Sequence, residues 1–133
     1  MHPDDAELVR VYTREKGTLI GDITFPVTDD FEIVVEAKAG STIHGQGVHY
    51  ETGVFLRDLT ANVDIPIDPL AGYTGHMMDP NWPTMPVQFV YTVQADDLIG
   101  KENHICQVYA FLKAGWLHAN VSLGVSPLFM LTA

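Results

Sequence analysis

Hydrophobic and polar residues alternate along much of the chain with a period of two, the spacing of a β-strand that buries one face. This alternation is found in residues 18–25, 31–38, 62–67, 87–94, 105–113 and 117–125. In the first segment, Leu19, Ile23 and Phe25 share one face and are expected in the core. Two more segments, 48–60 and 128–131, are rich in strand-forming residues but lack a clear period. The pattern therefore predicts about eight or nine short strands.

The N-terminal segment fits two kinds of structure. An aspartate near its start is a suitable cap for a helix that ends near Gly17. Val9, Val11 and Thr13 are β-branched and alternate with other residue types, which favours a strand. We expect the strand and keep the helix as the alternative.

Turn chemistry separates the predicted strands and indicates how they are connected. Gly115 lies at the bend of a predicted hairpin between the two longest late strands. Pro66 has no backbone N–H to donate to a neighbouring strand, so residues 62–67 are predicted to form an edge strand. With no internal helical segment of about ten residues, the chain is predicted to be an all-β antiparallel sandwich. A terminal hairpin and an interrupted last strand are typical of immunoglobulin-like and fibronectin-like architecture, which by itself implies no function.

Composition limits the class of protein and its partners. A length of 133 residues with 47% hydrophobic and 18% charged residues predicts one compact domain over residues 1–133. A formal charge of −10 disfavours nucleic acid and anionic membranes as partners. The single cysteine excludes an internal disulfide and a multi-cysteine zinc site. The chain has no apolar run of about twenty residues, and its start lacks the pattern of a signal sequence, so we expect a cytoplasmic protein and keep removal of a leader as the alternative.

The least regular part of the sequence is residues 66–86, which hold five of the eight prolines. Loops of this length in compact domains are often binding loops or lids. The large side chains in it favour a structured cap on the sandwich over disorder. If the loop binds a partner, we expect Tyr73, His76, Trp82 and Met85 to form the binding surface, with the aromatic residues as exposed anchors.

The same loop also suggests a copper site. Thioether sulfur is a soft ligand that favours Cu(I), and His76, Met77, Met78 and Met85 lie within ten residues. Against this reading, adjacent residues of an extended chain face opposite sides, and methionine commonly fills gaps in a core. Copper is therefore an alternative, and no other cofactor is predicted.

The remaining polar residues have simpler structural explanations. His44 and His49 flank a glycine-rich stretch without a third metal ligand. His104 and Cys106 share a strand face, but apolar residues continue that face, so we expect a buried thiol rather than a nucleophile. Acidic pairs such as Asp29-Asp30 fall where turns are expected, which explains them better than calcium does.

No complete catalytic constellation is present among these residues. The sequence therefore favours a non-catalytic binding or protein-interaction domain whose partner it does not identify. Self-association is a further possibility, because both faces of the tail at residues 128–131 are apolar. A copper-binding sandwich and an enzyme with a small-molecule cavity between the sheets are the alternatives.

Overall fold

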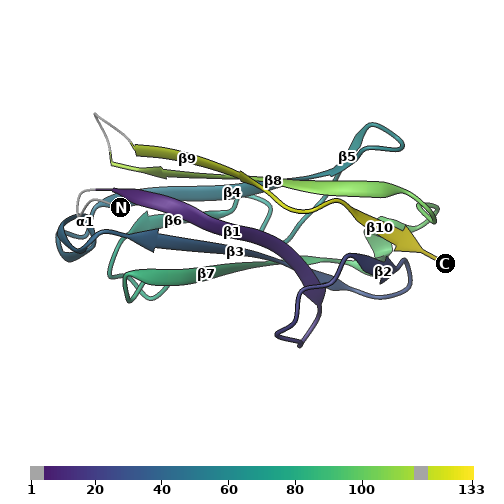
Figure 1. The fold of residues 1–133 in the computed structure, drawn as a ribbon, viewed down its shortest axis with the longest axis horizontal. Coiled ribbons are helices and arrows are strands. Elements are labelled where there is room, and N and C mark those ends of the chain that lie inside the picture. Colours follow the sequence, from purple (N-terminus) through teal and green to yellow (C-terminus); the bar gives the residue numbers. More distant parts are fainter. Residues whose placement is uncertain (1–4, 116–119) are drawn as a thin grey trace.

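The computed structural model describes residues 5–115 and 120–133, which form ten strands in two facing sheets (Figure 1). The strands are β1 (Ala6–Glu15), β2 (Thr24–Pro26), β3 (Phe31–Ala39), β4 (His49–Asp58), β5 (Val63–Ile65), β6 (Tyr73–His76), β7 (Pro86–Val93), β8 (Ile105–Ala114), β9 (Asn120–Val125) and β10 (Phe129–Thr132). A short helix, α1 (Ser41–Gly45), and a 3-10 turn, Ala95–Leu98, complete the regular elements. No helix in the described ranges is long and apolar enough to cross a membrane.

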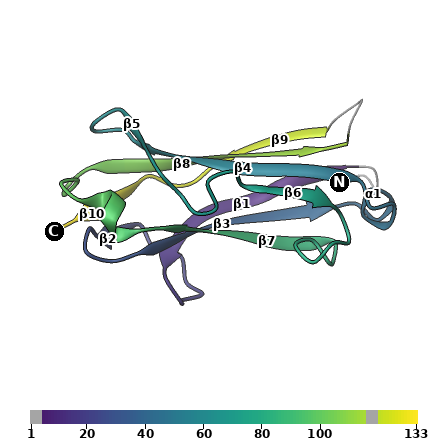
Figure 2. The ribbon, with the colours of Figure 1, turned by 180° about the vertical axis from the view of Figure 1, so that it is seen from behind.

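The strands are divided unequally between the sheets. The smaller sheet has the order β1-β3-β7, and the larger has the order β2-β10-β8-β4-β5. β9 and β10 pair with successive parts of β8, and β6 and β5 pair with successive parts of β4 (Figure 2). All these pairs are antiparallel except β10 with β2, which is parallel. The predicted antiparallel β-sandwich is confirmed, with this one parallel pair added.

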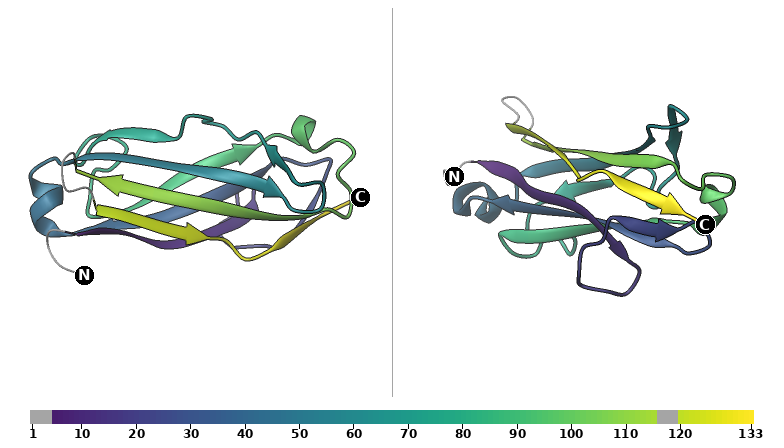
Figure 3. Two further views of the ribbon diagram at one scale, coloured as in Figure 1. Left: turned by 90° about the horizontal axis from the view of Figure 1, so that it is seen from above. Right: turned by 45° about the vertical axis from the view of Figure 1, so that its right-hand side comes forward.

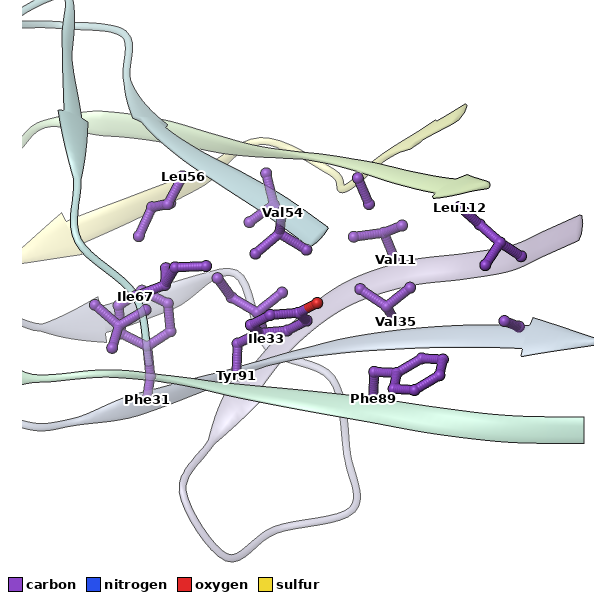
Figure 4. Packing of buried hydrophobic residues seen from close by; sticks show 14 of the residues in the cluster. Val11, Phe31, Ile33, Val35, Val54, Leu56, Ile67, Phe89, Tyr91 and Leu112 are labelled. Atoms are coloured by element: carbon purple, nitrogen blue, oxygen red, sulfur yellow. The ribbon is translucent and has the colours of Figure 1, made fainter. Parts of the chain in front are cut away.

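The core fills the space between the two sheets (Figure 4). Alternate residues of β3 and β7 point inward, as the period of two predicted. Residues of β4 and β8 meet them from the larger sheet. The buried residues shown include Phe31, Ile33, Val35, Val54, Leu56, Phe89, Tyr91 and Leu112.

The prediction of a strand at residues 18–25 is wrong for most of that segment. Leu19 is 87% exposed and Ile23 is 56% exposed, although both were expected in the core. The chain folds back on β1 here, where the N–H of Asp22 donates to the carbonyl of Thr13, so no sheet covers these side chains. Only Phe25 is buried as predicted, and its ring stacks on that of Phe31.

Two other expectations about local structure have opposite outcomes. The N-terminal segment is a strand, because β1 pairs along its length with β3. The irregular segment 66–86 is not without regular structure, since it contains β6, which pairs with the first half of β4. The alternation in β6 covers four residues, too few to stand out among prolines and glycines.

Candidate functional site: an apolar face of the larger sheet

Apolar side chains gather on the outer face of the larger sheet, where β4, β8 and β9 lie side by side. The register places Phe55, Tyr109 and Val125 opposite one another in one row. It places Gly53, Phe111 and Leu123 in the next row. We call the following residues the outer apolar face: Phe55, Tyr109, Phe111, Val121, Leu123 and Val125.

Five of these six side chains are exposed to a degree that is unusual for large apolar residues grouped together, and Phe111 is half-buried. Leu123 is 78% exposed, Val121 61%, Phe55 60% and Val125 56%. Tyr109 is 39% exposed. Single exposed apolar residues are common on soluble proteins, whereas contiguous groups mark interaction sites.

The packing of β1 against β9 explains why β9 turns its apolar residues outward (Figure 3). The backbone N–H of Leu8 donates to the Ser122 hydroxyl at 3.0 Å. At Gly124, a Cβ atom would lie 3.2 Å from the side chain of Val11, tighter than ordinary contact. Small residues are therefore needed on the inner face of β9, and its large residues take the outer face.

Gly53 shapes the centre of the outer apolar face. A Cβ atom at this position would lie 2.8 Å from the Phe111 ring, so glycine lets that ring lie over the β4 backbone. The Phe111 ring is 6.3 Å from that of Phe55, centroid to centroid. The two rings form a continuous aromatic surface across β4 and β8.

Charged residues lie at the two ends of the outer apolar face and not in its centre. At one end, Glu51 on β4 is directly opposite Lys113 on β8. At the other end, Arg57 donates to the Asp64 carboxylate at 2.9 Å and to the Asn62 side-chain oxygen at 2.7 Å. The surface is thus an apolar centre between two polar ends, as in a protein interface with a polar rim.

In the segment 66–86, the aromatic residues are not exposed as the sequence predicted. Trp82 is fully buried, so the prediction of an exposed anchor at this position is wrong. Its ring packs edge-on against Tyr50 and Phe89, and its indole N–H donates to the Met85 carbonyl. The Asp79 carboxylate accepts the Trp82 backbone N–H at 3.0 Å, which holds the turn that directs the indole inward.

The other three residues of that predicted surface lie in mixed environments. Tyr73 is half-buried, and its hydroxyl donates to the Val90 carbonyl at 2.7 Å, so the prediction of an exposed anchor fails here as well. His76 and Met85 are exposed. A role for these two in binding a partner stays a prediction.

The four residues of the predicted copper site are distributed between the core and the surface. Met77 is 1% exposed and belongs to the core, whereas Met78 and Met85 are 59% and 44% exposed. His76 places its Nδ1 3.2 Å from the Gly47 carbonyl. In the part of the chain that the structure describes, no three His, Cys, Asp or Glu side chains form a metal-binding group. Copper binding, which rested mainly on thioethers, stays a prediction.

Three other histidines within residues 5–115 take part in structural contacts. His44 is buried, with Nε2 3.1 Å from the Trp82 carbonyl. His49 lies opposite His76 in the β4–β6 ladder, with 5.6 Å between the ring centroids. His104 Nδ1 lies 2.6 Å from the fully buried carboxylate of Asp58.

Cys106 is a core residue rather than an activated thiol. Its side chain is fully buried. Burial, together with the negative charge of Asp58, raises the pKa of the thiol to about 12. A nucleophilic cysteine needs the opposite shift, so this geometry supplies no thiolate at neutral pH.

A hollow lies outside the sandwich, on the smaller sheet. It has a volume of about 790 Å³ and is bounded by the β1–β3–β7 surface and by the loop prolines Pro80, Pro83 and Pro86. Within it, the Gln88 amide donates to the Glu36 carboxylate at 3.1 Å. The space between the sheets is occupied by the core, so the hypothesis of a small-molecule enzyme stays a prediction without a candidate site.

Comparisons with known proteins place the fold and leave the family open. No protein-family model matches the chain, and no curated protein matches its sequence. A similar solved structure is AggA, the major subunit of aggregative adherence fimbriae type I from Escherichia coli, with a TM-score of 0.56. The similarity covers 99% of each chain at 8% sequence identity, so it is a similarity of fold.

Proposed function

We propose that this chain is a non-catalytic protein-interaction domain that binds through the outer apolar face. The observation that carries the proposal is the grouping on three adjacent strands of five exposed apolar residues, Phe55, Tyr109, Val121, Leu123 and Val125, around the half-buried Phe111. Apolar surface gains about 25 cal/mol per Å² when it leaves water, so covering this group with a partner is favourable. Its aromatic content and uncharged centre match the residues that interface cores use.

The structural comparison supports the same class of function. The similar structure is a major fimbrial subunit, a protein that forms part of an assembly. The 8% identity makes this a similarity of fold, which is compatible with an interaction role and does not identify a partner. The immunoglobulin-like or fibronectin-like architecture expected from the sequence is part of this proposal, since such sandwiches commonly present faces and edges to other proteins.

The test compares two lysine substitutions at exposed apolar positions. Leu123→Lys places a charge in the centre of the outer apolar face, and Ile99→Lys places one at a 79% exposed position outside it. Wild-type and variant domains are immobilised, incubated with extract of the source cells, and the retained proteins are identified by mass spectrometry. We expect a specific partner, whatever its identity, to be retained by the wild type and by Ile99→Lys and lost by Leu123→Lys. Equal retention by both variants would contradict the proposal.

A further inference from the structure

We propose that the partner of the outer apolar face is a second copy of this chain, and that the two copies pack face to face with their β4 strands antiparallel. This inference rests on the proposed function and specifies its partner and geometry. The dimer has a twofold axis in the interface plane, perpendicular to the strands, which passes between the Phe55 row and the Leu123 row.

This axis brings unlike residues together at every position. Each residue of β4 meets the β4 residue equally far on the other side of the axis, so Phe55 lies against Gly53 of the second copy. On β9, Leu123 lies against Val125 of the second copy. The absence of a side chain at Gly53 leaves Phe111 alone above that position, and the incoming Phe55 ring extends the aromatic surface.

The charges at the ends of the face favour this arrangement over the alternative. Glu51 and Arg57 lie at opposite ends of β4, so the proposed axis sets Glu51 of each copy against Arg57 of the other. A twofold axis parallel to the strands, along β8, would place each row of one copy against the same row of the second copy. Lys113 would then lie against Lys113 of the second copy. Opposite charges at the rim fix register, and like charges there are unfavourable.

Net charge explains why the copies use this face and not another. Each chain carries a formal charge of −10, so acidic surfaces of two copies repel. The two central rows of the outer apolar face contain no charged residue. The face has a neutral apolar centre and carries one acidic and one basic residue, Glu51 and Arg57, on the same strand. Such a face is complementary to a second copy of itself, a property that binding to an unrelated partner would not require.

The size of the face predicts a weak dimer. Three strands about 4.8 Å apart and a ladder of about seven residues cover a flat area of roughly 15 by 24 Å. This is smaller than a standard interface, to which each partner contributes about 800 Å². We therefore expect reversible association that depends on protein concentration.

Charge exchange at Glu51 and Arg57 tests both the partner and the register. Sedimentation velocity over a concentration series gives the dimer Kd of the wild type, of Glu51→Arg, of Arg57→Glu and of the double variant. We expect each single variant, which sets like charges together twice per dimer, to raise the Kd at least about tenfold. The double variant should return the Kd to near the wild-type value, because the pair is restored across the interface.

Controls separate this effect from net charge and from misfolding. Asp96→Arg changes the net charge as much as Glu51→Arg does, at an exposed position outside the face, and should leave the Kd within about twofold. Thermal unfolding of every variant checks the fold, which matters most for Arg57 because it also bonds Asp64. Glu51 and Arg57 are six positions apart on one extended strand, so recovery in the double variant cannot arise within one copy.

Each result decides the proposal. A wild type that remains monomeric up to about 1 mM would overturn it. Folded single variants with unchanged Kd, or a folded double variant that remains dissociated, would overturn the antiparallel register. Neither outcome touches the proposed function, which fails only if Leu123→Lys and Ile99→Lys retain the same proteins.

Discussion

Asp58 is a buried carboxylate whose removal tests the electrostatic account of the fold. Its side chain is fully buried and accepts hydrogen bonds from Lys101 Nζ at 3.2 Å and from the Ala61 N–H at 3.1 Å. His104 Nδ1 lies 2.6 Å from the same carboxylate. Together these contacts tie the end of β4 to the turn that follows it and to the segment just before β8.

We expect Asp58→Asn to destabilise the protein by about 3 kcal/mol, since breaking a buried ion pair costs about 3–5 kcal/mol. The lower end applies because the side chains of Lys101 and His104 are 20% and 23% exposed and can regain water. With a urea m-value of about 1.5 kcal/mol/M, the unfolding midpoint should fall by about 2 M. Circular dichroism during urea titration measures this shift.

The difference between wild type and variant should also depend on pH. Burial alone would raise the pKa of Asp58, but hydrogen bonds from His104, Ala61 and Lys101 outweigh it, and the pKa is lowered. The folded state thus binds this proton less readily than the unfolded state. The stabilisation is complete above the ordinary pKa near 3.9 and is lost as the pH falls through the lower folded value. The difference should therefore shrink below about pH 4.

Asp64→Asn is the matched control for this experiment. The Asp64 side chain is 71% exposed and pairs with Arg57, so its loss should change stability by less than about 1 kcal/mol. If Asp58→Asn changed stability no more than Asp64→Asn does, the buried carboxylate would not have the role assigned to it.

Two further predictions concern the core. Trp82→Ala should lower the free energy of unfolding by about 3–5 kcal/mol because Trp82 is fully buried, and a cost below about 1 kcal/mol in urea titration would contradict this burial. At pH 8, Cys106 should react with a thiol reagent such as iodoacetamide only after denaturation, because it is buried and its thiol pKa is raised to about 12. Rapid labelling of the native protein, followed by mass spectrometry, would refute that assignment.

The strands with strict alternation could be predicted because each has one face on the core. β3 and β7 are paired along their whole length, so their inward residues follow the period of two. The expected strand at residues 18–25 failed because alternation says nothing about whether a neighbouring strand is available. Leu19 has the right spacing and still lies in a loop beyond the sheets.

The candidate site could not be predicted, since alternation does not tell which face of a strand is buried. Val121, Leu123 and Val125 have the spacing of core residues, and only the close approach of β1 turns them outward. One signal was available in the sequence, because small or polar residues alternate with them at positions such as Gly124. The opposite error was made at Trp82, where an aromatic residue in an irregular loop was expected at the surface.

The most direct test of the central claim is a dilution series followed by amide chemical shifts of the ¹⁵N-labelled protein. Association through the outer apolar face predicts concentration-dependent shifts at Phe55, Tyr109 and Leu123 and at their neighbours on β4, β8 and β9. The same series should leave the amides of residues 76–86 unchanged. Shifts confined to that loop, or no shifts at any concentration, would contradict the assignment of the outer apolar face as the contact surface.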